Sequence, residues 1–404
     1  MIDRPSYTGA IAPYVDAPLV KVLSGVRRSG KSTILLMVMD MLRDRGVPDD
    51  RIVRYSFDSL RYVDLHTEAD YYRLIANRLA EGEGRAYLFL DEVQEIPSWE
   101  KVVNSLMVDF DVDLYVTGSN SRLLASEIST YLTGRYVSIP VYPLSFREFL
   151  AFAHELGVEQ PRREAFSDYL RKGGFPVIHA NGMNEDQAYA VVGDIYASIV
   201  LKDIVQRHDI RKTEQLEHIA RFALENAGKT FSAKSVSDYL KSQQRAISTE
   251  TVYGYLSFLE QAFLLYRCPR FDIRGKEVLK TQEKYFVADS ALKYSQLGYS
   301  PTSVASMLEN VVYLELKRRG YAVFVGKLGS AEIDFVAEKQ GRRLYVQVAR
   351  SLELASTRER EYGNLLAVPD GYPKFVVTAD ASWEGDYEGV RTMHAADFLL
   401  SDEW

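Results

Sequence analysis

The chain has 404 residues, of which 47% are apolar and 26% charged, and its formal net charge is −7. This length suits two or three domains rather than a single core, and the composition is that of a globular protein. The negative net charge excludes a general attraction of the whole surface to nucleic acid, so any such binding must be local.

The same data narrow the expected location. No apolar run approaches the roughly 20 residues that cross a bilayer, so we expect no membrane association. The N-terminus lacks the cationic and apolar segments of a signal peptide, and Cys268 is the one cysteine of the chain. A disulfide within the chain is thereby excluded, and the cytoplasm is the expected location. The six histidines are scattered without the spacing of zinc ligands.

Strand-like and helix-like segments alternate over the first 150 residues. Five strands are predicted, at 20–24, 52–56, 87–91, 113–117 and 136–140. The first strand runs into a glycine-rich turn, and a helix is predicted after it over 32–45. This alternation is typical of an α/β domain in which helices flank a parallel sheet.

The glycine-rich turn matches the phosphate-binding pattern G-x-x-x-x-G-K-[ST] in full, as GVRRSGKS. Glycines let backbone N–H groups approach phosphates, and the following helix presents its N-terminus to the same anion. Lys31 would place its charge on the β- and γ-phosphates of ATP, and Ser32 would offer a hydroxyl to Mg²⁺. The predicted ATP-binding residues are Gly25, Val26, Arg27, Arg28, Ser29, Gly30, Lys31, Ser32 and Thr33.

Two acids, Asp91 and Glu92, end the third predicted strand. Asp91 suits the outer shell of Mg²⁺, and Glu92 is placed to polarise an attacking water, which predicts hydrolysis as well as binding. Thr117, at the end of the fourth strand, is a candidate for positioning that water, and Gln94 is a weaker one. Ordinary loop polarity is the alternative for both.

These stretches resemble a bacterial and archaeal family that joins an AAA+-type P-loop ATPase domain to a C-terminal domain of unknown function with a nuclease-like fold. The resemblance covers nearly the whole chain. It rests on the glycine-rich turn and on FLDEVQ at 89–94, TGSN at 117–120, LTGRY at 132–136, PLSFREF at 143–149, GGFP at 173–176 and EIDF at 332–335. The resemblance implies binding and hydrolysis of ATP.

Arg135 lies directly before the fifth strand, after a helix predicted over 122–132. In AAA+ ATPases an arginine at this place commonly reaches the ATP of a neighbouring subunit and stabilises the transition state. We favour this role, which implies a ring-like homo-oligomer with six subunits as the expected number. A surface arginine, or one that serves its own subunit, is the alternative.

Four domains are predicted. They are an ATPase domain over 1–150, a helical connector or lid over 151–225, a winged-helix-like domain over 226–300 and a restriction-endonuclease-like domain over 301–404. In the third, helices at 233–240 and 249–260 precede strands at 264–268 and 284–287.

The winged-helix-like segment carries ten basic and six acidic residues over 228–284, with Arg267, Arg270 and Lys284 among the basic ones. This local excess favours contact with DNA phosphates. The alternative is a lid or spacer whose charges form a solvated face.

In the last domain, a helix predicted over 304–319 precedes strands at 321–325, 332–337 and 344–348. Active nuclease-like members carry a helical glutamate, an aspartate and then Glu-x-Lys, and the matching positions here are Glu309, Asp334, Gln347 and Ala349. Gln347 is a weaker metal ligand and Ala349 lacks the amine. We therefore expect a degenerate site without nuclease activity, kept as a binding or assembly module.

Two functions fit the sequence. The first is an oligomeric ATP-driven remodeller or motor that acts on nucleic acid. The alternative is a nucleotide-switched signalling or regulatory scaffold with a protein partner and no activity that depends on nucleic acid.

Overall fold

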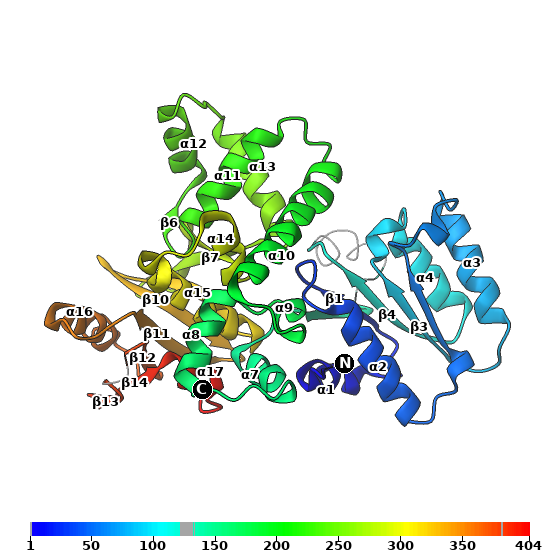
Figure 1. Cartoon of the computed structure of the whole chain (residues 1–404), viewed down its shortest axis with the longest axis horizontal. Helices are drawn as coiled ribbons and strands as arrows, with labels where there is room; N and C mark the ends of the chain where they lie inside the picture. Colours follow the sequence, from blue (N-terminus) through cyan, green and yellow to red (C-terminus); the bar gives the residue numbers. More distant parts are fainter. Residues whose placement is uncertain (1, 122–131, 133, 381–382) are drawn as a thin grey trace. The chain divides into compact units, whose positions relative to one another are not determined.

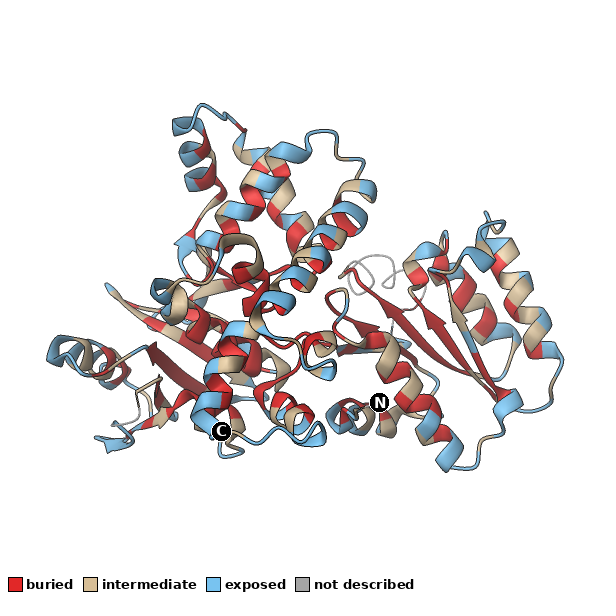
Figure 2. Ribbon diagram, viewed as in Figure 1, coloured by how far each residue is buried: buried red, intermediate tan, exposed pale blue. Residues whose placement is uncertain are grey.

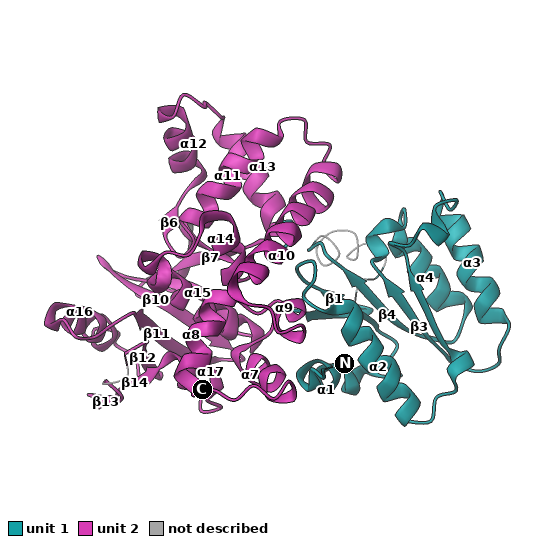
Figure 3. Cartoon of the chain, viewed as in Figure 1, with its two compact units in different colours: residues 1–142, 261–263 teal, residues 143–260, 264–404 magenta. Residues whose placement is uncertain are grey.

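A computed structural model of the chain describes residues 2–121, 132, 134–380 and 383–404 (Figure 1). The chain forms two compact units (Figure 3). The first consists of Met1–Tyr142 with Gln261–Phe263, and the second of Pro143–Glu260 with Leu264–Trp404.

The first unit is built on a parallel five-stranded sheet, as predicted. Its strands are β1 (Val20–Ser24), β2 (Ile52–Ser56), β3 (Ala86–Asp91), β4 (Val112–Gly118) and β5 (Tyr136–Pro140). Their order is β2-β3-β4-β1-β5, and every neighbouring pair runs parallel. Because the strands are parallel, their carboxyl ends meet at one edge of the sheet, where ligands bind in folds of this kind.

Both faces of this sheet are covered, so its three central strands, β1, β3 and β4, are buried (Figure 2). Successive side chains of a strand point to opposite faces, and Leu88 and Leu90 therefore enter one core while Phe89 enters the other. The covering helices are α1 (Pro5–Ile11) and α2 (Lys31–Asp44) on one face, and α3 (Glu68–Ala80) and α4 (Trp99–Asp109) on the other. Short helices complete the unit: η1 (Ala12–Tyr14), η2 (Asp49–Arg51), η3 (Leu60–Tyr62) and η4 (Val93–Glu95). The helix predicted over 122–132 falls outside the described residues except for Leu132.

The second unit begins with helices, which confirms the helical prediction for 151–225. They are α7 (Phe146–Glu155), α8 (Arg162–Lys172), α9 (Pro176–Ala180), α10 (Glu185–Ser198), the π-helix η5 (Ile199–Gln206) and α11 (Thr213–Glu225). The two helices predicted next follow as α12 (Ala233–Ser242) and α13 (Thr249–Gln261). Leu256 and Leu259 of α13 are buried, as their spacing on one helix face predicts.

A nine-stranded sheet runs through the rest of the unit. Its strands are β6 (Thr230–Phe231), β7 (Leu265–Asp272), β8 (Glu277–Val287), β9 (Ala322–Leu328), β10 (Ala331–Lys339), β11 (Arg342–Ala349), β12 (Lys374–Thr378), β13 (Gly385–Tyr387) and β14 (Val390–His394). Their order is β13-β14-β12-β11-β10-β9-β7-β8-β6. The remaining helices are α14 (Ser290–Leu297), η6 (Pro301–Ser303), α15 (Val304–Arg318), α16 (Ala355–Leu366) and α17 (Ala395–Leu400).

The pairing of β7 with β9 joins two segments that the sequence separates into domains. These strands run parallel, with Arg270 opposite Val325 and Asp272 opposite Lys327. Residues 226–300 and 301–404 consequently share one sheet and one compact unit.

Two stretches on which the family resemblance rests, 143–149 and 173–176, are hydrogen-bonded to each other in the second unit. Gly174 donates its N–H to Asp289 Oδ2 at 2.6 Å and accepts the N–H of Leu144 at 2.6 Å. A Cβ at Gly174 would lie 2.4 Å from the Leu144 carbonyl oxygen, and one at Gly173 would lie 1.7 Å from Asp289 Oδ1. Burial raises the pKa of Asp289 to about 7, against the opposing effect of its N–H donors. The Leu144 backbone therefore leaves no room for a side chain at Gly174, and the Asp289 side chain leaves none at Gly173.

Among the described residues, none of the helices is both long and apolar enough to cross a membrane.

Candidate nucleotide-binding site

The phosphate-binding loop leaves β1 at the carboxyl edge of the parallel sheet. A Cβ at Gly25 would lie 2.0 Å from the carbonyl oxygen of Val141, so only glycine fits. Arg28 and Gly30 take φ angles of 66° and 100°, which curl the chain into the start of α2. The N-terminal N–H groups of α2 thereby open towards the loop, as an anion-binding helix requires.

Lys31 is the first residue of α2 and lies inside this loop. Its Nζ donates to the carbonyl oxygens of Gly25 at 2.9 Å and Val26 at 3.2 Å, and the residue is only 3% exposed. The ammonium is therefore held beside the backbone that would wrap the phosphates. The other predicted members divide into buried Val26 and Ser29, half-buried Arg27, Gly30, Ser32 and Thr33, and exposed Arg28.

Arg4 supports the loop from the N-terminal segment, and sequence reasoning missed it. Its guanidinium donates to the carbonyl oxygens of Ser29 at 2.7 Å and Tyr142 at 2.9 Å, and it lies 4.5 Å from the ring centre of Tyr7. Arg4 is 2% exposed, so its charge is buried against these acceptors. An arginine at this place belongs to no motif, and only the folded chain shows that it anchors the loop.

The acid at the end of β3 is hydrogen-bonded to the loop helix. Asp91 Oδ1 accepts the hydroxyl of Ser32 at 3.0 Å and that of Thr117 at 2.5 Å. Asp91 Oδ2 accepts from Arg54 at 3.1 Å and Ser56 at 3.3 Å. The structure thus brings Ser32, Asp91 and Thr117 together. A hydroxyl and a carboxylate at this separation are ligands that Mg²⁺ takes directly or through water, so these residues fit the implied ion.

Glu92 follows in a backbone conformation that is rare for a residue with a side chain. Its φ and ψ are 55° and 53°, in the left-handed region, which costs on the order of 1 kcal/mol. The N–H of Glu92 donates to Thr117 Oγ1 at 2.9 Å, and Gln94 Nε2 donates to the Glu92 carboxylate. The Thr117 hydroxyl therefore donates to Asp91 and accepts from Glu92, and it holds both acids.

Arg135 lies at the amino ends of the strands, opposite the carboxyl ends where the phosphate-binding loop begins. Tyr136, the next residue, pairs with Val20 at the start of β1, whereas the loop begins after Ser24 at its end. Five residues of strand separate the two positions, which is roughly 16 Å. The Arg135 carbonyl oxygen accepts the N–H of Val20 at 2.8 Å, and the residue is exposed.

In the second unit, the three predicted nuclease-like residues also come together. Asp334 on β10 donates its N–H to Gln347 Oε1 at 2.6 Å, and Lys284 of β8 lies between Asp334 and Glu309 of α15. Burial and the nearby Asp334 carboxylate raise the pKa of Glu309, against the opposing effect of the Lys284 ammonium. Burial by itself lowers the pKa of Lys284, but the carboxylates of Glu309, Asp334 and Glu332 outweigh it and raise that pKa. Sequence reasoning missed Lys284 and Glu332 as members of this cluster.

Three cations of the basic winged-helix-like segment lie beside acids of the chain. Lys284 is buried among carboxylates, Arg270 lies 3.7 Å from Glu332, and Arg267 lies within 3.5 Å of both Glu260 and Glu283. Lys284 and Arg270 are largely buried, and a buried charge is tolerated only when it is paired, whereas the Arg267 side chain is 52% exposed and pairs with acids at the surface. The positive excess that can meet DNA is therefore smaller than the sequence count.

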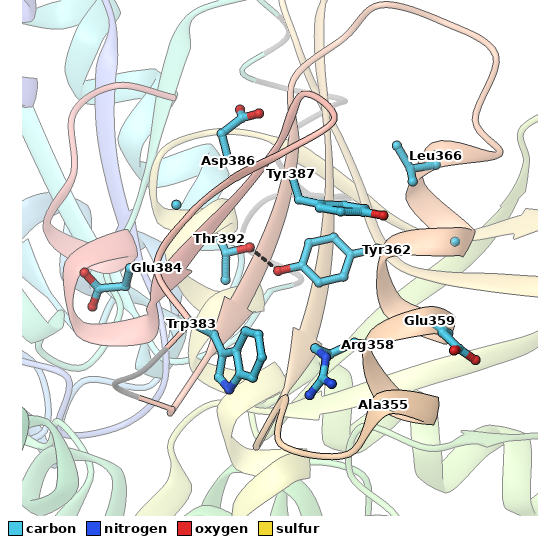
Figure 4. Close-up of a pocket in the computed structure, with 12 residues that line it drawn as sticks. Ala355, Arg358, Glu359, Tyr362, Leu366, Trp383, Glu384, Asp386, Tyr387 and Thr392 are labelled. Atoms are coloured by element: carbon cyan, nitrogen blue, oxygen red, sulfur yellow. Dashed lines mark hydrogen bonds between the residues drawn. The ribbon is translucent and has the colours of Figure 1, made fainter.

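A cavity of about 590 Å³ lies between α16 and the β13–β14 hairpin, and none of its lining residues is a predicted site residue (Figure 4). The rings of Tyr362 and Tyr387 meet there at 5.1 Å, and the Arg358 guanidinium lies 4.4 Å from the Trp383 ring centre. Tyr362 and Thr392 share a hydrogen bond of 2.5 Å at its wall. No motif pointed to this cavity.

Comparison with known proteins places the chain in a family. A model of an AAA domain matches residues 17–150, and a model of a domain of unknown function (DUF8612) matches residues 163–303. A solved structure, the Walker-type ATPase of Pyrococcus abyssi, has a TM-score of 0.52 at 14% identity and covers 73% of this chain and 95% of its own. That likeness supports the P-loop ATPase fold.

Two relatives extend the match along the sequence. An uncharacterized protein of Methanocaldococcus jannaschii is 28% identical over 358 residues, which are 85% of this chain and 77% of the relative. An uncharacterized protein of Haemophilus influenzae is 38% identical over 404 residues, which are 99% of each chain. The chain therefore belongs to the family of AAA-domain P-loop proteins that includes this Haemophilus influenzae protein.

Proposed function

We propose that this protein is a Mg²⁺-dependent ATPase that works as an oligomeric remodeller or motor on nucleic acid. The observation that carries the ATPase part is the hydrogen-bonded group of Ser32, Asp91, Thr117 and Glu92 beside the phosphate-binding loop. A loop that only binds nucleotide needs no second acid in a costly backbone conformation, whereas hydrolysis needs a group that can take a proton from water.

Each residue then has a separate task. The loop N–H groups and Lys31 bind the phosphates, and Ser32 and Asp91 hold Mg²⁺, which supplies charge neutralisation when bound. Glu92 orients the attacking water and accepts its proton. Thr117, buried beneath both acids, acts as a positioning residue and does not touch the water.

Arg135 supports the oligomeric part of the proposal. It lies about one strand length, roughly 16 Å, from the loop of its own subunit, which disfavours a contact in cis. Its exposure leaves it open to a neighbouring copy. A head-to-tail contact that brings Arg135 to the next subunit's ATP would close into a ring if the rotation per subunit permits.

Mixing two inactive variants tests this arrangement. Lys31→Ala subunits keep Arg135, and Arg135→Ala subunits keep the loop, so each lacks one half of a shared site. We expect the mixture to recover part of the ATPase activity at mixed boundaries, because transition-state stabilisation by such an arginine is worth about 10³-fold or more. No recovery, together with a monomeric mass in light scattering with ATP, contradicts the ring.

The nucleic-acid part of the proposal rests on exposed cations around α12 and α13. Lys229, Lys234, Lys241 and Arg245 are all exposed. All four lie in or next to α12, on the helical part of the winged-helix-like segment. The paired cations Arg267, Arg270 and Lys284 are not among them. Their charges can attract phosphates even though the whole chain is acidic.

DNA should therefore raise the ATPase rate, and the effect should fall as salt rises. The variant Lys234→Ala with Lys241→Ala should weaken DNA binding and reduce its salt dependence by about two charges. A steady-state ATPase assay with and without duplex and single-stranded DNA, at several salt concentrations, measures both.

A matched control removes the same charge elsewhere. Lys101→Ala with Lys202→Ala deletes two exposed lysines outside α12 and α13 and should leave the stimulation unchanged. An ATPase rate that DNA leaves unaltered at low salt would instead favour the nucleotide-switched scaffold with a protein partner.

A further inference from the structure

The carboxylate cluster of the second unit contains a cation that the chain supplies. Lys284 Nζ lies 3.2 Å from Glu309 Oε2, 3.0 Å from Glu332 Oε1 and 3.5 Å from Asp334 Oδ1. Its side chain is 6% exposed. Three carboxylates from α15 and β10 therefore surround one ammonium from β8, at distances typical of charge-assisted hydrogen bonds or slightly longer.

The backbone of Lys284 holds the ammonium in this position. Lys284 pairs with Thr230 of β6 on one side and with Cys268 of β7 on the other. A residue between two paired strands has its side-chain direction set by the pleat. The side chain would have to leave the packed interior for another cation to take its place.

The side-chain amide of Gln347, next to this cluster, already forms hydrogen bonds through both its oxygen and its nitrogen. Gln347 Oε1 accepts the N–H of Asp334 at 2.6 Å, and Gln347 Nε2 donates to Glu361 Oε2 at 2.6 Å. The second oxygen of Asp334 accepts the N–H of Val348 at 2.8 Å. The Gln347 amide and one carboxylate oxygen of Asp334 are therefore already hydrogen-bonded within the protein, and a metal ion would compete with these bonds.

A divalent cation of the kind that active nuclease-like members hold does not fit these residues. Mg²⁺ and Ca²⁺ require oxygen ligands at about 2.0–2.6 Å, and the carboxylates here are arranged around an ammonium instead. In the part of the chain that the structure describes, no group of three or more His, Cys, Asp and Glu side chains is spaced to hold a metal ion.

We propose that Lys284 is a built-in replacement for the divalent cation of a nuclease-type site. Its ammonium bridges Glu309, Glu332 and Asp334, occupies the place of a metal ion, and ties β8 to α15 and β10. Lys284, which the sequence analysis counted among the cations available to DNA, thereby helps to join the two halves of the nine-stranded sheet. Removal of this ammonium should let the three carboxylates close around a divalent cation, because without a positive charge between them they repel one another.

The test replaces Lys284 by a neutral side chain of similar length, in full-length protein without nucleotide. We expect Lys284→Met to melt at a lower temperature than wild type and to gain about 5 °C with saturating Mn²⁺. With Mn²⁺, the melting temperature of wild type should rise no more than that of the control variant Lys293→Met. Lys293 is also a buried lysine of this unit, but its ammonium donates to the carbonyl oxygen of Glu225 at 3.4 Å. Calorimetric titration with Mn²⁺ gives the binding directly.

A second variant decides the matter if Lys284→Met does not fold. Adding Glu332→Gln removes the most exposed of the three carboxylates, at 37% exposure, and keeps Glu309 and Asp334 as ligands. Stabilisation of this double variant by Mn²⁺, without a response of wild type, supports the proposal. A wild-type response equal to that of the variant shows that metal displaces Lys284, and no response of any folded variant shows that the cluster is no metal site. Either result overturns the proposal.

Discussion

Replacement of Lys31 by alanine should lower ATP affinity by about 100-fold or more. Hydrogen bonds to charged groups contribute about 1.5–3 kcal/mol each, and the ammonium is expected to contact two phosphates. The residue is buried in the loop, where its bonds to the carbonyl oxygens of Gly25 and Val26 fix the position of the ammonium. Calorimetric titration of the nucleotide-free protein with ATP and Mg²⁺ measures the change.

The control for this variant is Lys101→Ala, which removes an exposed lysine of the same unit and should leave the affinity unchanged. Since Lys31 also bonds to the loop backbone, a thermal melt must show that the variant is folded. A folded Lys31→Ala protein that binds ATP as wild type does would remove the nucleotide site from this loop.

The substitution Glu92→Gln should leave ATP binding intact and slow hydrolysis by about 10²- to 10⁴-fold. Glutamine has nearly the same shape and can keep its contact with Gln94, but a neutral amide cannot accept a proton from water. Single-turnover hydrolysis, compared with ATP affinity, separates the chemical step from binding.

The matched control is Glu83→Gln, which makes the same chemical change at an exposed position of the first unit. A third variant, Thr117→Val, tests the positioning role through the same readouts. It should impair hydrolysis less than Glu92→Gln, because it disturbs the two acids and removes neither. Turnover of Glu92→Gln near the wild-type rate would assign the proton transfer to another group.

Local patterns were enough to propose the nucleotide site, which stays a prediction, and to predict most strands of the chain. The phosphate-binding loop spans eight consecutive residues between a strand and a helix, and the structure has both, as β1 and α2. Asp91 and Glu92 could be named because an apolar run ends at them. Such signals lie within a few residues of one another, and backbone periodicity alone reveals them.

Contacts between distant residues decided the rest. Arg4 reaches Ser29 and Tyr142, which lie 25 and 138 residues further along the chain, and no short pattern encodes either bond. The role of Thr117 between two acids depends on the register of β3 against β4. These features arise from strand order and packing, which the local sequence does not specify.

The clearest difference between the sequence-based expectation and the structure concerns the charge of Lys284. In the sequence, Lys284 counts as one more cation of a basic segment, equal to Lys234 or Lys241. In the fold it is buried among three carboxylates, whereas the other two lysines are exposed. The composition of a segment shows how many charges it carries, but only the tertiary structure decides which are neutralised inside the protein, because burial makes an unpaired charge too costly to keep.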